Sequence, residues 1–151
     1  MKIEDIIKTT SPMKIGKRTI LNILYTQNLI GEKFNEVLKS YDLSPEQFNV
    51  LRILKGQNGN ATNMCVIQER MIAKTSNTTR LVDKLLLKEL VTREICPDNR
   101  RKMEIAITDK GLDLLDEVNP KVDRHEALFA QNLTVEELEQ LNNLLEKFRS
   151  I

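Results

Sequence analysis

Residues 75–111, TSNTTRLVDKLLLKELVTREICPDNRRKMEIAITDKG, change their hydrophobic period twice. In the first part, apolar residues recur every three or four positions. This spacing predicts an amphipathic helix, capped by Thr75 or Ser76 and continuing through NTTRLVDKLLLKEL. The segments LVTREIC and KMEIAIT then show mostly alternating, β-leaning character and predict two short strands around PDNRR. The stretch therefore predicts a helix followed by a β-hairpin with a basic tip, and Thr108 then caps another helix.

Three further helices are predicted before this stretch. Residues 15–41 carry apolar side chains at helical spacing and predict one long amphipathic helix. The next begins at Ser44, where Pro45 and Gln47 complete a capping box, and ends near the breaker GQNGN. A short third helix is predicted from the Thr-Asn pair of ATNM to about Met71, and either residue of that pair is able to cap it.

Two helices are predicted after the hairpin. The first starts at Thr108, and Pro120 should kink or interrupt it. The last opens with a capping box at Thr134 and Glu137. Its apolar stripe has the spacing of a helix-packing seam and consists of Leu138, Leu141, Leu145 and Phe148. The terminal helices therefore offer apolar faces on either side of a compact middle.

Length and composition predict one soluble domain. A chain of 151 residues with 40% hydrophobic and 30% charged residues can build a core without disulfides. No apolar run approaches the roughly 18 residues of a membrane-spanning helix. The first ten residues, MKIEDIIKTT, also lack the apolar region and cleavage site of a signal peptide. We therefore expect a cytoplasmic protein with no membrane partner.

Charge is distributed unevenly along the chain, although the net charge is only +1. Residues 1–59 hold nine cations and six anions, and residues 60–110 hold ten cations and seven anions. Residues 111–151 hold four cations and nine anions. A basic first two-thirds and an acidic remainder are compatible with one surface that meets a polyanion.

The cysteines and the single histidine give little support for a chemical site. Cys65 and Cys96 fit neither a disulfide framework nor a CxxC motif, and small buried thiols are expected. Cys96 is nevertheless a candidate redox switch, because cations surround it in the hairpin. His125 has no second soft ligand, so we expect a solvated side chain and no metal site. Without a phosphate loop or catalytic set, neither an enzyme nor a cofactor is predicted.

The order of helix, short helix, turn, longer helix and basic hairpin describes a winged helix-turn-helix, mainly α with a small β-wing. On a helical wheel, residues 75–89 have an inner side formed by Thr78, Leu81, Val82, Leu85 and Leu86. The outer side holds Ser76, Arg80, Asp83, Lys84 and Leu87, with Asn77 and Thr79 on the shoulders.

The outer side of this helix is predicted to enter the major groove of DNA. Its hydroxyl, amide and cationic groups donate to phosphates and base edges. The residues predicted to contact DNA there are Ser76, Asn77, Thr79, Arg80 and Lys84. Asp83 should confine contact to the first half of the helix, and Leu87 is a candidate to pack under a neighbouring element. The alternative is that residues 76–79 form only a polar helix start and have no role in DNA binding.

The same stretch resembles the core of MarR-type transcriptional regulators. In that family a T-x-R-L-V-x-x-L helix precedes an L-V-x-R strand, a wing with D-x-R, and an L-T-x-x-G helix start. The matching residues are Thr78, Arg80, Leu81, Val82, Leu85, Leu90, Val91, Arg93, Arg101, Ile107, Thr108 and Gly111. The order of helices outside this core matches too, so the resemblance covers nearly the whole chain.

This resemblance implies a symmetric homodimer on double-stranded DNA. Residues 1–41 and 112–151 would form the dimerisation helices, and residues 42–111 the winged helix-turn-helix. Each recognition helix would enter a major groove of a palindromic operator, while Arg100, Arg101 and Lys102 serve the wing at the minor groove. Family members commonly repress, and many release DNA when a small phenolic or other aromatic effector enters a cleft between the two regions.

Two residues depart from the family pattern. Glu89 stands where Gly usually ends the recognition helix, so it must adopt a left-handed conformation or end the helix differently. Asn99 replaces the Asp that usually assists the wing arginine, which removes charge assistance for Arg101. The oxidant sensing of some relatives uses a Cys near the chain start, and this chain has none there.

A second hypothesis is a winged-helix module for protein interaction or assembly without DNA. Its motivation is the near-neutral net charge and the presence of Asp83 on the supposed groove face. An unknown enzyme is a third option, for which the sequence offers no motif.

Overall fold

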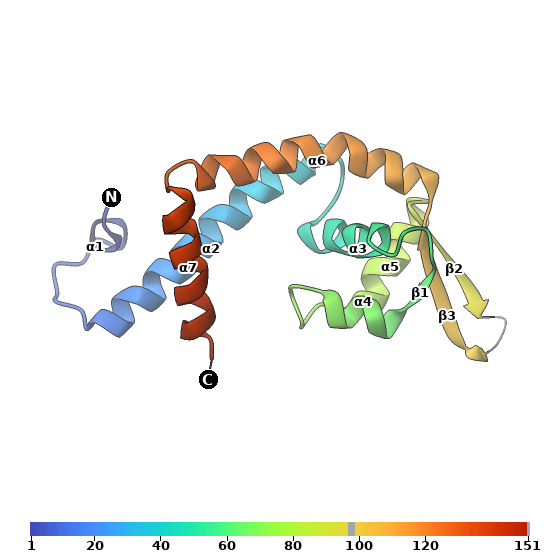
Figure 1. The fold of residues 1–151 in the computed structure, drawn as a ribbon, viewed down its shortest axis with the longest axis horizontal. Coiled ribbons are helices and arrows are strands. Elements are labelled where there is room, and N and C mark those ends of the chain that lie inside the picture. The colour runs from blue at the N-terminus through green and yellow to red at the C-terminus, as the bar shows by residue number, and fades with distance from the viewer. Residues whose placement is uncertain (97–98, 151) are drawn as a thin grey trace.

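The computed structural model describes the whole chain except residues 97, 98 and 151, and for Arg100 and Arg101 it describes the backbone alone. The described elements are, in order, α1 (Ile3–Ile6), α2 (Ile15–Lys39), α3 (Pro45–Lys55), β1 (Thr62–Asn63), α4 (Met64–Arg70), α5 (Thr78–Leu87), β2 (Val91–Cys96), β3 (Asn99–Ile107), α6 (Asp109–Ala130) and α7 (Val135–Phe148). This is the predicted winged helix-turn-helix, mainly helical with one small sheet (Figure 1).

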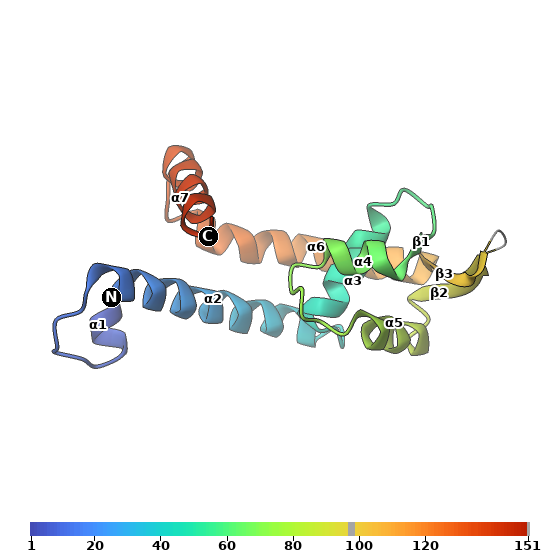
Figure 2. The same cartoon turned by 90° about the horizontal axis from the view of Figure 1, so that it is seen from below.

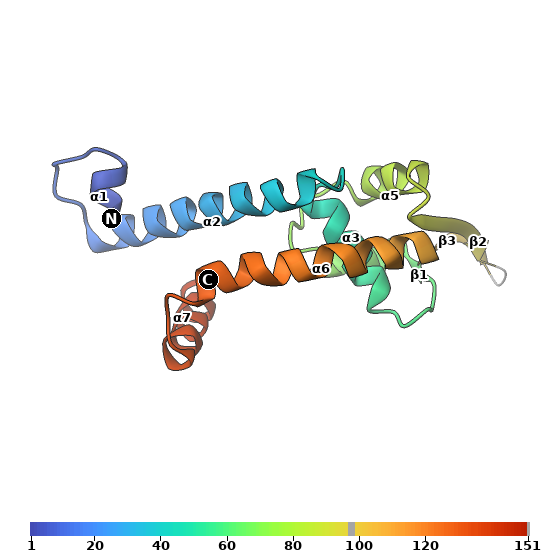
Figure 3. The same cartoon turned by 90° about the horizontal axis from the view of Figure 1, so that it is seen from above.

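The molecule is elongated, with a compact winged helix at one end. Helices α3, α4 and α5 pack together beside the sheet, and the β2–β3 hairpin extends from that end (Figure 1). Helices α2 and α6 run side by side away from it, towards α1 and α7 (Figures 2 and 3). Both terminal segments therefore lie at the end of the molecule that is far from the hairpin (Figures 2 and 3).

The sheet has three antiparallel strands in the order β1-β3-β2. The hairpin pairs Val91 with Ile107, and its register shifts between Ile95 and Cys96. The two-residue strand β1 pairs Thr62 with Ile105 and so joins the start of α4 to the sheet. Sequence analysis did not predict β1, because two residues carry no period.

One hydrophobic core joins the winged helix to the end of α2 and to α6. Its fully buried members come from α2, α3, α4, α5, β3 and α6 and include Leu38, Val50, Leu51, Ile67, Val82, Leu85, Ile105, Leu115 and Val118. The buried residues of α3 are Gln47, Phe48, Val50, Leu51 and Leu54, and the buried residue of α4 is Ile67. Burial of this kind contributes roughly 1.5–3 kcal/mol per large side chain, so this core fixes the position of α5.

Side-chain caps set most helix starts as predicted. Ser44 and Thr134 each form a capping box, with Gln47 and Glu137 respectively. The Thr108 hydroxyl accepts a hydrogen bond from the backbone N–H of Gly111 at 3.1 Å. The start predicted for α5 was wrong, because the cap is Asn77 and not Thr75 or Ser76.

Of the two effects predicted for Pro120, the interruption is wrong, because α6 continues through the proline. The proline removes one backbone donor, which costs a helix about 3 kcal/mol in an isolated setting. Val118 and Val122, one on each side of the proline, are buried in the core and attach both halves of the helix to it. Tertiary packing therefore outweighs the local penalty.

Glu89 adopts the left-handed conformation, with φ of 61°. The N–H of Glu89 donates to the Leu86 carbonyl at 2.9 Å, and that of Leu90 donates to the Leu85 carbonyl at 3.1 Å. These two bonds form a Schellman motif, the helix ending in which Gly is usual. Gly111 packs against this turn so closely that a Cβ would lie 2.4 Å from the Leu90 carbonyl oxygen.

The terminal helices leave much of their apolar surface exposed. On α2 and α7 the exposed large apolar side chains are Ile15, Ile20, Leu24, Tyr25, Ile30, Val135, Leu141, Leu144 and Phe148. Helix α7 has no buried residue in the single chain. Across the described residues, no helix has the length and apolar character needed to cross a membrane.

Candidate nucleic-acid interface

Helix α5 presents the two faces that its sequence predicts. Thr78, Val82 and Leu85 are buried, and Leu81 and Leu86 are partly buried against the core. The other face is open to solvent and carries Thr79, Arg80, Asp83, Lys84 and Leu87. Leu87 is 86% exposed, so the suggestion that it packs under a neighbouring element is wrong.

The N-terminus of α5 is fixed to α4 by polar contacts. The buried Thr78 hydroxyl donates to the Oε1 atom of Gln68. The amide group of Gln68 donates in turn to the Lys74 carbonyl at 2.8 Å. These bonds hold the turn between the two helices and orient the first turn of α5.

The predicted contact residues of α5 differ in how free their side chains are. The Asn77 Oδ1 atom accepts the Arg80 backbone N–H at 3.1 Å, so only its amide N–H groups remain for another partner. Ser76 is partly buried, whereas Thr79, Arg80 and Lys84 are exposed. The latter three side chains make no hydrogen bond or ion pair with the described part of the chain. Arg80 and Thr79 thus present unpaired donors.

Asp83 is neutralised by the strand beside it. Its Oδ1 atom accepts a hydrogen bond from the Arg93 Nη1 atom at 2.6 Å. The pair joins α5 to β2, and both side chains are partly exposed to solvent. The repulsion of phosphate expected from Asp83 is therefore largely offset. Sequence reasoning missed this role of Arg93, although the L-V-x-R motif contains it.

The hairpin presents further cations beyond α5. Lys102 is exposed on β3. The side chains of Arg100 and Arg101 lie outside the described residues, so their predicted wing contacts remain predictions. Asn99 opens β3 opposite Cys96.

Both cysteines are more accessible than expected. Cys65 is exposed on α4 and Cys96 is partly exposed in β2. The prediction of small buried thiols is therefore wrong. Cys65 lies on the solvent side of a short amphipathic helix, whose opposite side carries the buried Ile67.

A large apolar cleft lies between the winged helix and the terminal helices. It has a volume of about 1150 Å³ and is lined by residues of α2, α3, α6, α7 and the α4–α5 turn. Most of its exposed lining surface is apolar, and its charged or titratable lining residues are Glu46 and Arg52 of α3 and His125 and Glu126 of α6. Such a cleft, mostly apolar with a few polar groups, suits a small organic ligand.

His125 is buried, so the expected solvated side chain is wrong. Its ring lies 5.4 Å from that of Phe34 and 5.3 Å from that of Phe129. The Nε2 atom lies 3.3 Å from the Ile30 carbonyl oxygen and is suited to donate to it. The Nδ1 atom has no hydrogen-bond partner among the described residues. The burial of His125 has no local signal in the sequence, because the residues around it come from two separate helices.

Comparison with known proteins agrees with this geometry. Residues 43–103 match the family model described as MarR family. The regulator YpoP of Bacillus subtilis is 32% identical over 116 residues, which cover 76% of this chain and 78% of YpoP. The chain belongs to the MarR family. MhqR, a transcriptional regulator of Bacillus subtilis, is 29% identical over 121 residues, or 78% of this chain and 80% of MhqR.

Solved structures share the fold. The 2,4-dichlorophenol-bound form of the organohalide-sensing regulator RdhR-CbdbA1625 has a TM-score of 0.82 at 20% identity, covering 93% of this chain and 85% of that one. BpsR of Bordetella bronchiseptica, whose DNA binding is regulated by 6-hydroxynicotinic acid, has a TM-score of 0.80 at 18% identity, covering 93% and 99%. Its family and its regulator relatives make this MarR-family protein a DNA-binding transcriptional regulator, and the solved structures share its winged helix-turn-helix fold.

Proposed function

We propose that the protein is a repressor that binds a near-palindromic operator as a homodimer. Residues 42–111 form the DNA-binding region, and residues 1–41 and 112–151 form the dimerisation region. The observation that carries the proposal is the exposed first turn of α5, where Thr79 and Arg80 have no partner within the described residues and Thr78 anchors the turn. We assign no catalytic residue and no cofactor. Because its ligand is chromosomal DNA, we expect the protein to act in the cytoplasm.

The proposed contacts divide between the groove and the backbone. Arg80, Ser76, Asn77 and Thr79 contact base edges or phosphates in the major groove, and Lys84 continues the same face. Arg100, Arg101 and Lys102 serve the wing, with Arg101 the residue that enters the minor groove. The Asp83–Arg93 pair supports the assignment, because it removes the main repulsive group from the groove face.

The homodimer is supported by the exposed apolar faces of α2 and α7. Leu24, Leu144 and Phe148 are each at least half exposed in the single chain. A second copy that covers these side chains would bury them, and a two-fold dimer would place two α5 helices on one side of the DNA. Half-sites about one helical turn apart follow from that arrangement.

The effector is proposed to bind in the apolar cleft, which touches both regions of the chain. BpsR is regulated by 6-hydroxynicotinic acid, a hydroxylated aromatic acid, and RdhR-CbdbA1625 binds 2,4-dichlorophenol, a chlorinated phenol. A small phenolic or other aromatic molecule fits the part of the cleft that is lined by Phe34 and Phe48, with Arg52 available for a carboxylate. Binding there would shift α3, and with it α5, relative to α2.

Replacing Arg80 tests the groove assignment. Arg80→Ala should weaken binding to a specific operator by about 1–3 kcal/mol, because a bidentate contact to a base is lost. Fluorescence anisotropy on an operator duplex measures this. The matched control is Arg124→Ala on α6, which should bind as the native protein does. Equal affinities of the two variants would contradict the assignment.

A further inference from the structure

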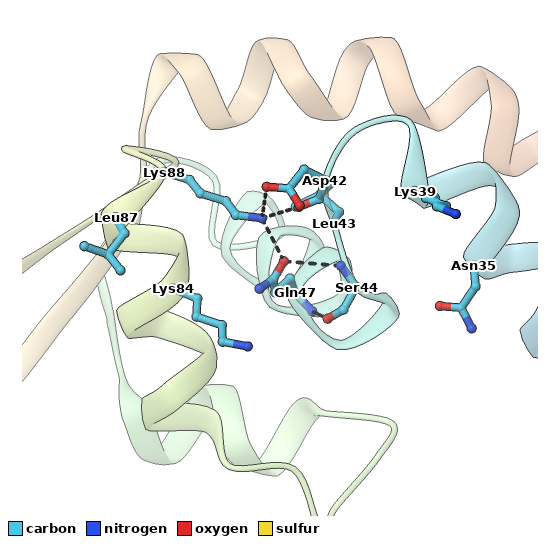
Figure 4. A pocket seen from close by; sticks show the side chains of 9 residues that line it. All are labelled: Asn35, Lys39, Asp42, Leu43, Ser44, Gln47, Lys84, Leu87 and Lys88. Carbon is cyan, nitrogen blue, oxygen red and sulfur yellow. Dashed lines mark hydrogen bonds and ion pairs between the residues drawn. The ribbon is translucent and has the colours of Figure 1, made fainter.

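A second cavity lies beside the recognition helix, on the side away from the hairpin. It has a volume of about 590 Å³ and lies between the end of α2, the α2–α3 turn and the second half of α5 (Figure 4). We call it the lysine cleft, and its lining residues are Asn35, Lys39, Asp42, Leu43, Ser44, Gln47, Lys84, Leu87 and Lys88.

The charges of the lysine cleft are not balanced. Lys88 is committed, because its Nζ atom lies 3.0 Å from Asp42 Oδ2 and 3.4 Å from Gln47 Oε1. The side chains of Lys39 and Lys84 have no hydrogen bond or ion pair with any described residue. Lys84 lies on one wall of the cleft and Lys39 on the other (Figure 4). Two unpaired cations remain around one cavity, and an anion between them is electrostatically favoured.

Neutral hydrogen-bond donors line the lysine cleft beside the two lysines. The Asn35 amide lies on the same wall as Lys39 (Figure 4). The Ser44 Oγ atom accepts the Gln47 backbone N–H at 3.1 Å, which leaves its own O–H able to donate. Phosphate oxygens accept bonds from lysine, amide and hydroxyl groups alike. The cleft therefore has the chemistry of a phosphate site.

The position of the cleft identifies the source of the phosphate. Lys84 and Leu87 belong both to the cleft and to the outer face of α5, where Leu87 is 86% exposed. A helix in a major groove about 12 Å wide has a phosphate backbone along each side. The element next to α5 on this side is the end of α2, so the cleft lies where one backbone would pass.

We propose that the lysine cleft holds a phosphate of the DNA backbone, between Lys39 of α2 and Lys84 of α5. A helix of the dimerisation region thereby contacts DNA directly. This inference rests on the proposed function, since it needs α5 to enter the major groove. It adds Asn35, Lys39 and Ser44 to the residues that meet DNA.

The salt dependence of DNA binding tests the proposal. The probe is an operator duplex, taken from genomic fragments that the native protein enriches. Lys39→Gln should weaken binding roughly threefold to tenfold and lower the slope of log K against log salt by about 0.9. Sequence preference should stay the same, because phosphate contacts carry no sequence information. Lys39→Arg should keep the native slope.

The control is Lys17→Gln, an equal loss of charge at the far end of the same helix. Lys17 is exposed on α2, has no partner in the described chain and lies outside the cleft. It should leave the salt slope unchanged. Equal slopes for the Lys39 and Lys17 variants would overturn the proposal.

A second set of measurements distinguishes failure of the lysine-cleft proposal from failure of the proposed function. If Arg80→Ala loses specific binding while Lys39→Gln does not, the assignment of α5 to the major groove is retained. The assignment of a DNA phosphate to the lysine cleft is then contradicted. If the native protein enriches no DNA, both the proposed function and the lysine-cleft proposal are contradicted. Inorganic phosphate is titrated against the amide NMR signals of residues 35–44. Shifts that Lys39→Gln abolishes, with an unchanged DNA salt slope, would show a site for free anions and contradict the assignment to DNA.

Discussion

At the scale of single residues, Arg93 controls the charge on the outer face of α5, because it pairs with Asp83. Arg93→Gln leaves the Asp83 carboxylate unpaired beside the DNA, so affinity should fall and the loss should shrink at high salt. The free energy of unfolding should change by less than about 1 kcal/mol, because both side chains are partly exposed. Anisotropy titrations and urea unfolding measure the two quantities.

The double variant Asp83→Asn with Arg93→Gln is the matched control. It removes the carboxylate together with its partner, and should recover most of the lost affinity. Equal binding by the single and double variants would show that Arg93 does not act through Asp83.

Glu89 provides a prediction about stability. Its φ of 61° costs a residue with a side chain about 1 kcal/mol relative to glycine. The Lys110–Glu89 ion pair at 3.0 Å is exposed and offsets little of this. Glu89→Gly should therefore stabilise the protein by about 1 kcal/mol, measured as a higher urea midpoint at fixed protein concentration.

Glu89→Ala separates the backbone from the ion pair, since it loses the pair and keeps the left-handed strain. It should stay within about 0.5 kcal/mol of the native protein. Stabilisation by Ala as large as that by Gly would place the penalty in the side chain and not in φ.

The sequence predicted the burial of single residues well where a helical period determines it. The helical wheel placed Thr78, Val82 and Leu85 on the buried face of α5, because burial follows the helical repeat. It could not find the Asp83–Arg93 pair or the buried His125, because these depend on which elements meet in the fold.

At the scale of elements, local chemistry predicted most of the boundaries. The capping boxes at Ser44 and Thr134 gave the starts of α3 and α7 directly. Three adjacent residues, Thr75 to Asn77, are all good caps, so sequence alone could not choose among them. Helix α1 has four residues and β1 has two, which is too short for any period.

The wing is the element whose contribution to binding is most open to direct measurement. Arg101→Ala should weaken operator binding and lower the salt slope by about one unit, if its guanidinium meets the minor groove and its phosphates. Arg149→Ala, an exposed arginine just past α7, is the control for loss of one positive charge. Native affinity and slope in Arg101→Ala would show that the wing assignment is wrong.

At the scale of the whole molecule, many of the exposed apolar side chains lie on the terminal helices. Leu144 and Phe148 of α7 are 57% and 50% exposed. Replacing both by Glu puts two charges on the proposed dimer surface, and light scattering should report a monomer. Affinity for a palindromic operator should fall more than tenfold, since one subunit reaches only one half-site. An unchanged mass would contradict the proposed dimer surface.

The most direct test of sequence-specific DNA binding is selection of genomic fragments by the purified protein at several salt concentrations. The native protein should enrich fragments that share a near-palindromic motif, with half-sites about one helical turn apart, and Arg80→Ala should lose that enrichment. If no sequence is enriched at any salt concentration, the central claim is contradicted, and the winged helix is better explained as a module for protein interaction.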